Sequence, residues 1–258
     1  MIIPAGGKIH PDFERVVGTD SKALIRLEGK TVLSGTLESL RALPATRRIV
    51  VIGGEEVKRE AGSVVDEVLP EEKTGPQNIF AGLRWLTNSY NPANHILIIT
   101  SDLPFVSPQA LEAFLNLCPP EKDFCVPLIS RESFIDAFPR AEATFVTLID
   151  GTWTTGCAYL VTPKGMFTAM EPIERVFANR KSKLGMARIL GLNFVYGYLT
   201  QKLTVSDVET KVKEVLNCSA VAVPGSPPEL AYDIDYVEDY HYALQAIKLR
   251  SRGSAAHV

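Results

Sequence analysis

The sequence predicts a three-layer α/β/α sandwich built on a mostly parallel, Rossmann-like mixed sheet. Short apolar segments alternate with amphipathic ones over the first 117 residues, which favours parallel strands connected by helices. Residues 96–99 are all branched and apolar, as is typical of a strand covered on both faces. A chain of 258 residues can bury a large core. We expect one domain over residues 1–250 and a flexible tail of small and polar residues over 251–258.

The first half of the chain predicts a regular alternation of elements. Strands are expected over 1–3, 49–52 and 96–100, and helices over 33–43, 79–86 and 111–117. Ser107 and Pro108 fit the cap and first residue of the third helix. Gly29-Lys30-Thr31 resembles the end of a P-loop, but Leu24 stands where that motif needs glycine. This triplet is therefore interpreted as a turn that leads into the first helix.

The second half predicts a less regular arrangement. Segments 124–128, 145–148 and 158–161 are of β type and are separated by turns such as Asp150-Gly151, which favours antiparallel or mixed strands. A helical stretch over 172–190 follows, then a helix with the capping-box pair Ser206 and Glu209. A strand over 220–223 and an extended segment at 232–235 lead to the last helix.

Composition and charge exclude several classes of protein. The net charge is −3 with a pI near 5.9, so the chain offers no basic field for nucleic acid. The four cysteines show no zinc-ligand spacing, and reduced thiols suit a cytoplasmic protein. The N-terminus does not resemble a signal peptide, and no apolar run approaches the ~18 residues of a membrane span. We expect a cytoplasmic protein with small-molecule partners.

A single acid ends the most apolar strand. Asp102 follows the segment 96–100 and precedes Leu103-Pro104, and open α/β sheets bind ligands at the carboxyl ends of their strands. A carboxylate there is the ligand type that Mg²⁺ takes, together with water and substrate phosphates. The alternative is a helix cap, but Ser107 already fits that role. Asp102 is therefore a candidate metal ligand.

A glycine turn follows the first strand. Ala5-Gly6-Gly7 lacks bulky side chains, so its backbone N–H groups can approach an anion closely. The turn matches neither common glycine-rich phosphate motif, and a purely structural turn is the alternative. Three cations follow it and are candidates to neutralise a triphosphate, with solvated surface charges as the alternative: Lys8, Arg15 and Lys22.

Two further segments carry polar side chains. Thr74-Gly75-Pro76-Gln77-Asn78 opens a helix; Asn78 either caps it or, with Gln77, reads a base or ribose by hydrogen bonds. Near the C-terminus, Asp233 and Asp235 project to one face if the backbone is extended. These acids either complement the dipole of the last helix or complete a metal site with Asp102.

Together these motifs resemble the MobA-like nucleotidyltransferases of the GT-A-type superfamily, in the family's order and over nearly the whole chain. The resemblance implies a GT-A nucleotidyltransferase fold, with Ala5 to Gly7 holding the base and phosphates. It implies that Lys22 contacts the phosphates, that Gly75 lies against the base, and that Asp102 binds the catalytic Mg²⁺. Asp235 resembles the second metal-binding acid, and Asp233 is the alternative.

The chain departs from the family after the glycines. Residues 8–18 replace a compact stretch of small residues, an arginine and Met-Gly, which leaves Lys8 and Arg15 both as candidates for the phosphate-binding cation. On the acceptor side, the segment 152–156 resembles a turn that faces the acceptor. Thr155 and Gly156 of this turn are therefore candidate acceptor-binding residues. Arg180 and Lys183 are further candidates, because they belong to a cation-rich stretch that could receive a phosphate group of the acceptor; solvated helix faces are the alternative for these two cations.

The resemblance implies Mg²⁺-dependent transfer of a nucleoside monophosphate from an NTP to a phosphorylated small-molecule acceptor, with release of pyrophosphate. Residues up to about 117 would bind the nucleotide, and the remainder would bind the acceptor. One alternative is a nucleotide-sugar glycosyltransferase, and another is a catalytically silent nucleotide-binding regulatory module. The sequence carries no prediction of the base, the identity of the acceptor or the oligomeric state.

Overall fold

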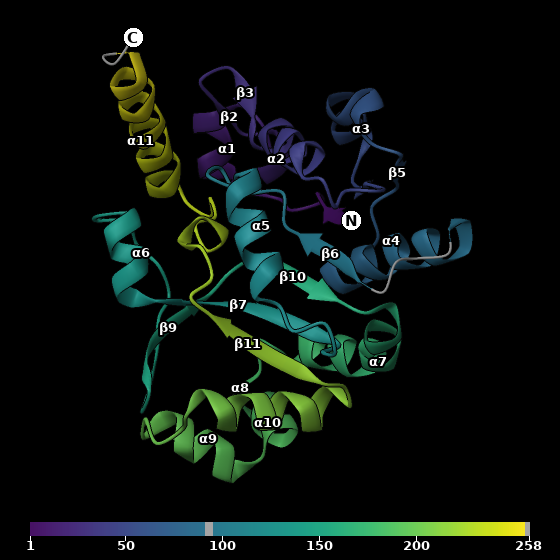
Figure 1. The fold of residues 1–258 in the computed structure, drawn as a ribbon, viewed down its shortest axis with the longest axis vertical. Helices are drawn as coiled ribbons and strands as arrows, with labels where there is room; N and C mark the ends of the chain where they lie inside the picture. Colours follow the sequence, from purple (N-terminus) through teal and green to yellow (C-terminus); the bar gives the residue numbers. More distant parts are fainter. Residues whose placement is uncertain (91–94, 256–258) are drawn as a thin grey trace.

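A mixed sheet forms the centre of the protein, with helices on both of its faces (Figure 1). The structure is a computed structural model that describes residues 1–90 and 95–255. These residues form one nine-stranded sheet in the order β5-β4-β1-β6-β10-β7-β9-β8, with β11 paired to β7. The predicted α/β class with a mixed sheet between helical layers is confirmed.

The nine strands of the main sheet are β1 (Ile2–Pro4), β4 (Val50–Ile52), β5 (Glu67–Leu69), β6 (Ile96–Ile99), β7 (Phe124–Ser130), β8 (Val146–Leu148), β9 (Gly151–Thr155), β10 (Ala158–Val161) and β11 (Ala220–Pro224). A separate two-stranded sheet joins β2 (Arg26–Leu27) and β3 (Lys30–Thr31).

The helices are α1 (Pro11–Val17), α2 (Val32–Ala42), α3 (Glu55–Ala61), α4 (Gly75–Ser89), α5 (Pro108–Leu117), α6 (Arg131–Ala137), α7 (Pro163–Asn179), α8 (Lys183–Leu190), α9 (Leu192–Leu199), α10 (Val205–Leu216) and α11 (Val237–Ala255). Three short 3-10 turns accompany them: η1 (Lys22–Leu24), η2 (Gly62–Val64) and η3 (Pro228–Leu230). Helices α8, α9 and α10 gather at one end of the molecule, away from α11 (Figure 1).

The sheet has a parallel part and a mixed part. Strands β5, β4, β1 and β6 run parallel to one another. Strand β10 then runs antiparallel to both β6 and β7, while β11 runs parallel to β7. Because β1 and β6 are parallel neighbours, their carboxyl ends lie at the same sheet edge, which is where such sheets bind ligands.

The two faces of the parallel part bury alternate residues of the same strands. Ile3 of β1 packs with residues of α2 and α5 in one apolar cluster, whereas Ile2 packs with residues of α4 and α7 in a second cluster. Successive side chains of a strand point to opposite faces, so a strand covered on both sides must be apolar throughout. This arrangement explains the uninterrupted apolar character of β4 and β6.

A third cluster holds the C-terminal segment against the carboxyl end of β6. Phe105, Phe138 and Tyr232 place their ring centroids 4.9 to 5.0 Å apart, within the range of favourable aromatic pairs. Tyr232 and Ile234 are buried in the same cluster. The segment that leads into α11 is therefore fixed by packing.

Helix caps confirm some predictions and correct others. Ser107 caps α5 as expected, and Thr31, the last residue of the predicted turn before the first helix, caps α2. The capping box of α10, however, joins Thr204 and Asp207, so the predicted pair of Ser206 and Glu209 is wrong. A similar polar spacing occurs twice in this stretch, and the Glu209 carboxylate instead accepts a hydrogen bond from Ala222 N at 2.7 Å.

The predicted helical stretch over 172–190 is two helices. Helix α7 begins at Pro163, contains Pro172 in its interior and ends at Asn179; α8 begins at Lys183 after its cap Ser182. Proline is common in a first helical turn, and in α7 Pro163 rather than Pro172 occupies that turn.

At the C-terminus, α11 continues to Ala255. Residues 251–255 of the expected tail thus lie in its last turns, and residues 256–258 lie outside the described part. No helix among the described residues is long and apolar enough to cross a bilayer.

Candidate functional site

Strand β6 places Asp102 at the carboxyl edge of the sheet. The backbone leaves the strand after Ile99, and the Ser101 hydroxyl donates to Pro4 O of neighbouring β1 at 3.3 Å. Asp102 is only 8% exposed, and its carbonyl accepts from Ile234 N at 3.1 Å. The acid is therefore fixed between the first strand and the C-terminal segment.

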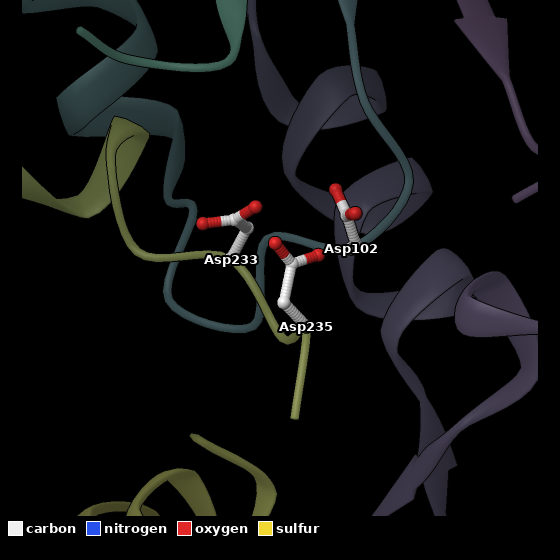
Figure 2. Close-up of side chains that lie close together, drawn as sticks. All are labelled: Asp102, Asp233 and Asp235. Atoms are coloured by element: carbon white, nitrogen blue, oxygen red, sulfur yellow. The ribbon is translucent and has the colours of Figure 1, made fainter. Parts of the chain in front are cut away.

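The C-terminal segment brings two more acids to Asp102. Asp233 and Asp235 flank Ile234, which is fully buried, so alternation of the backbone leaves the two carboxylates facing the site. Figure 2 shows the three carboxylates turned toward one another. One oxygen from each lies within 4.8 Å of the others. The sequence favoured Asp235 as the partner of Asp102, and the structure brings both acids to it.

Lys22 lies between these acids. Its Nζ donates to Asp102 Oδ2 at 3.2 Å and forms a second ion pair with Asp235 Oδ1. Burial disfavours the charged lysine, but attraction from Asp102 and the hydrogen bond to Asp235 outweigh it and raise the pKa of Lys22. Lys22 is therefore a charged side chain that the two acids fix in the site.

The cluster retains an excess of acids. Burial, and then the negative charges of Asp102 and Asp235, raise the pKa of Asp233 to about 7. Three carboxylates face one ammonium group, and Asp102 Oδ1 is buried with no hydrogen-bond partner in the described part of the chain. A buried carboxylate oxygen without a partner is costly, and carboxylate oxygens are the ligands of hard divalent cations. The donor set fits such an ion, held by Asp102, Asp233 and Asp235.

The glycine turn after β1 lies beside Lys22. Ala5 N donates to Ile52 O at 2.7 Å, and Gly7 O accepts from Lys22 N at 3.0 Å. A Cβ on Gly7 would meet Lys22 Cδ at 3.4 Å, and one on Gly6 would meet the Glu71 carboxylate at 2.3 Å. A side chain at Gly6 would therefore have to displace the Glu71 side chain, whereas one at Gly7 would make ordinary van der Waals contact with Lys22.

The two other candidate cations lie on the surface. Lys8 pairs with Asp20 at 2.8 Å, and Arg15 pairs with Asp12 at 3.0 Å. Residues 8–18 are not an open loop, because they contain helix α1, which ends at Gly18 with φ 74°. Lys8 lines a cavity of about 480 Å³ together with Ala5 and Gly6, whereas Arg15 does not.

Thr74 and Asn78 have different roles at the start of α4. Thr74 caps the helix by accepting from Gln77 N at 3.3 Å, so the suggested cap role of Asn78 is wrong. Asn78 is buried, and its Oδ1 accepts from Glu72 N at 2.6 Å. Gly75 is exposed, at the first position of the helix. The buried amide of Asn78 therefore fixes the loop that precedes the helix.

A second cavity, of about 510 Å³, adjoins the acids, and its lining includes Asp233, Asp235 and Thr155. Gly156 lies close to the backbone of η3, since a Cβ on Gly156 would meet Leu230 O at 2.9 Å. The predicted acceptor-facing segment 152–156 supplies Trp153 to this cavity. Sequence reasoning missed its other aromatic residues, Phe194, Tyr198 and Tyr232, because they come from separate elements without a shared motif.

The two predicted acceptor-binding cations lie elsewhere. Arg180 stacks on the ring of Phe177 at 3.5 Å and donates to Phe177 O at 2.7 Å. Lys183 begins helix α8. Neither lines the cavity beside the acids. The structure thus gathers Thr155 with the acids but not Arg180 or Lys183.

Comparisons with known proteins agree with this arrangement. The family model "MobA-like NTP transferase domain" matches residues 2–182. A hypothetical transferase from Thermus thermophilus has 28% identity and a TM-score of 0.81, over 92% of this chain and 97% of that one. The 4-diphosphocytidyl-2C-methyl-D-erythritol synthase from Anaerococcus prevotii has 13% identity and a TM-score of 0.59, over 96% and 94%. No curated protein matches the sequence.

The second of these likenesses concerns the fold alone, since its identity is low. The family match is different in kind, because it covers more than half of the chain and includes the glycine turn, Lys22 and Asp102. The chain belongs to the MobA-like NTP transferase domain family and is an NTP-dependent nucleotidyltransferase.

Proposed function

We propose that the protein transfers a nucleoside monophosphate from an NTP to a phosphorylated small-molecule acceptor and releases pyrophosphate. The observation that carries this proposal is the convergence of Asp102, Asp233 and Asp235 around Lys22, next to the glycine turn. Such chemistry needs positioning and charge stabilisation more than covalent help from the protein. The cluster combines acids for a cation with a lysine for phosphate oxygens.

Asp102 and Asp235 would hold Mg²⁺, and Asp233 lies close enough to join them. When bound, Mg²⁺ supplies charge neutralisation at the phosphate oxygens and orients them. Asp102 Oδ1, the buried oxygen without a partner, supports this assignment. The proton on Asp233 would have to leave before its carboxylate could bind the ion, because metal ligands are deprotonated.

The chain's own residues have distinct proposed roles. The turn Ala5 to Gly7 would hold the nucleotide through the backbone N–H groups of Gly6 and Gly7, since Ala5 N already donates to Ile52 O. Gly75 would lie against the base, with Gln77 and Asn78 near it. Lys22 would contact the phosphates and stabilise the charge of the leaving pyrophosphate. Lys8 is the better-placed second cation, since it lines the cavity beside the glycine turn and Arg15 does not.

We further propose that residues up to about 117 bind the nucleotide and that the remainder of a single domain binds the acceptor. The glycine turn, Lys22 and Asp102 come from the first part, and the cavity beside Asp235 is lined by residues of the second. The four cysteines are free thiols, which supports a reducing, cytoplasmic location.

The test is pyrophosphate release with each of the four NTPs and Mg²⁺ against a panel of phosphorylated acceptors. We expect release with one NTP, dependent on both the acceptor and the metal. Transfer from a UDP-sugar without pyrophosphate exchange from any NTP would instead identify a glycosyltransferase. Tight NTP binding without pyrophosphate release across the panel would identify a silent binding module.

A further inference from the structure

The cavity beside the acids has walls from β7, β8 and β9 of the sheet, from helices α9 and α10, and from the segment that leads into α11. Its volume of about 510 Å³ is in the range of small-molecule sites. Asp233 and Asp235 form part of its lining, so the cavity is continuous with the carboxylate cluster. Its other lining residues are Leu128, Glu142, Ala143, Thr144, Val146, Leu148, Trp153, Thr154, Thr155, Cys157, Phe194, Tyr198, Val208, Ala231 and Tyr232.

The charges of this cavity have one sign. Among the described residues that line it, none is lysine, arginine or histidine, and three are acids: Glu142, Asp233 and Asp235. The cation that serves the site, Lys22, contacts Asp102 and Asp235 at the cluster itself. Among the described residues that line the cavity, none can neutralise an anionic group, so such a group finds its counter-charge where the cavity meets the cluster. A second anionic group deeper in the cavity would meet like charge without a partner, which is costly.

The remaining wall is mostly apolar and aromatic. Trp153, Phe194, Tyr198 and Tyr232 contribute rings from β9, α9 and the C-terminal segment. Aliphatic side chains of β7, β8 and α10 fill the space between them. Threonines supply hydroxyl groups. Such a lining binds uncharged, apolar surface and offers only a few polar contacts.

We propose that this cavity receives the body of the acceptor, and that the acceptor is a phosphomonoester with one anionic end and an uncharged, mostly apolar body. This inference rests on the proposed function. An oxygen of the acceptor phosphate forms a bond to the α-phosphorus of the NTP. The bond from that phosphorus to the bridging oxygen breaks, and its electron pair leaves with pyrophosphate. No proton transfer is needed, because the attacking phosphate oxygen is already deprotonated.

The first test compares three acceptors that share a six-membered ring and a primary phosphate. They are cyclohexylmethyl phosphate, glucose 6-phosphate and glucose 1,6-bisphosphate, each assayed for pyrophosphate release with Mg²⁺ and the active NTP. We expect kcat/KM to fall in that order, by at least about tenfold from first to last. A higher kcat/KM for the bisphosphate than for cyclohexylmethyl phosphate would overturn the inference and leave the proposed function standing.

A binding measurement separates the inference from the proposed function. Trp153 lines the cavity. Trp85 lies on α4 and packs against Tyr90, which follows that helix. In the variant Trp85→Phe, Trp153 is the only tryptophan of the sequence and its fluorescence reports on the cavity. Titration of this variant with the three phosphates in Mg²⁺ should give the same order of affinity. The reverse order would overturn the inference. Absence of pyrophosphate release with every NTP would overturn the proposed function, whatever the order of binding.

A charge reversal tests where the acceptor body lies. Glu142 is exposed at the cavity, and Glu142→Lys would give a distal phosphate a partner. The ratio of kcat/KM for the bisphosphate to that for cyclohexylmethyl phosphate should rise by about tenfold. Glu112→Lys makes the same charge change on an exposed face of α5, outside this lining, and should leave the ratio unchanged. An unchanged ratio in Glu142→Lys would place the acceptor body elsewhere.

Discussion

Lys22 and the pair Lys8 and Arg15 are cations of the same N-terminal segment, yet their surroundings differ completely. The Lys22 side chain is 21% exposed and pairs with two acids that lie far away in the sequence. Lys8 and Arg15 are 57% and 78% exposed, and each pairs with an acid of its own segment. Exposed pairs contribute little because solvent screens them, whereas partly buried charges interact strongly.

The difference indicates how a working cation can be distinguished from a surface charge. The Lys22 ammonium group pairs with Asp102, which follows β6, and with Asp235 of the C-terminal segment. The tertiary structure therefore sets its position. The two other cations are held only by local pairs, which cost little to break. We therefore expect substitutions to separate the two groups sharply, and the predictions below test that separation.

The largest effect is expected for Asp102→Asn, which removes a charge from the centre of the cluster. Loss of metal-assisted charge stabilisation costs several kcal/mol, and each 1.36 kcal/mol is tenfold in rate, so kcat/KM should fall by about 1000-fold. Pyrophosphate release measures the activity, and thermal unfolding checks that the fold is intact. Near wild-type turnover would remove Asp102 from the mechanism.

Asp66→Asn is the matched control for this change. Burial favours the protonated form of Asp66, but the hydrogen bond from Ile49 N and the pairs with Arg48 and Arg41 lower its pKa. The free energy of unfolding of this variant should fall by roughly 2 kcal/mol at neutral pH, because a charged group that accepts hydrogen bonds is lost. The variant that remains folded should keep its turnover. The two aspartates thus separate a loss of catalysis from a loss of stability.

Lys22→Met should have the second-largest effect, about 100-fold in kcat/KM, which is typical of the loss of one positioned charge-stabilising group. The loss should appear in kcat as well as in KM, because the charge of the leaving group develops in the transition state. Lys30→Met, at an exposed lysine that pairs with Glu38, is the control and should retain activity. A loss confined to KM would assign Lys22 to ground-state binding alone.

The pH dependence of metal binding should show a moderate effect. The pKa of Asp233 rises from 3.8 in the unfolded chain to about 7 in the folded protein. Its contribution to stability is therefore full below pH 4 and is lost as the pH rises through 7. The Tm of metal-free protein should fall across this window, and added Mg²⁺ should raise it most above pH 7.

Mg²⁺ affinity gives the second readout of this titration. One competing proton predicts an apparent affinity that rises by up to about tenfold per pH unit below 7 and levels off above it. Calorimetry at several pH values measures it. Asp233→Asn removes the titrating group and should flatten both pH profiles, so a pH dependence that persists unchanged in this variant would assign the proton to another residue.

The smallest effects are expected for Lys8→Ala and Arg15→Ala. Their exposed pairs are worth at most about 1 kcal/mol, so kcat/KM should change by less than about fivefold. Lys8→Ala should have the larger effect of the two, since Lys8 lines the cavity beside the glycine turn. A loss of kcat/KM in either variant as large as that of Lys22→Met would contradict the distinction between the partly buried Lys22 and the two surface cations.

Much of the parallel part of the fold follows from local pattern. The strands at Ile2–Pro4, Val50–Ile52 and Ile96–Ile99 are apolar because both of their faces are covered, and this property is visible in the sequence alone. The caps Thr31 and Ser107 are local hydrogen bonds within one turn of helix. Such features depend on neighbours in the sequence, so sequence patterns predict them.

Predictions failed where two local patterns compete. Ser206 with Glu209 and Thr204 with Asp207 have the same i,i+3 spacing, and the second pair forms the capping box. Glu209 is engaged instead with the backbone of β11. At α4, Asn78 has the side chain of a cap, but burial beneath the preceding loop gives it a different partner. In both cases a tertiary contact decided between residues of equal local propensity.

The sequence by itself determined the strand that ends at Asp102, the glycine turn after the first strand and the spacing of Asp233 and Asp235. These are short-range patterns, and each can be detected within about ten residues. Only the tertiary structure decided that Lys22 joins Asp102 to Asp235, that Asp233 shares the cluster, and that the described residues lining the adjoining cavity include no cation. Those facts depend on strand order and on aromatic packing between distant segments, which no local pattern encodes.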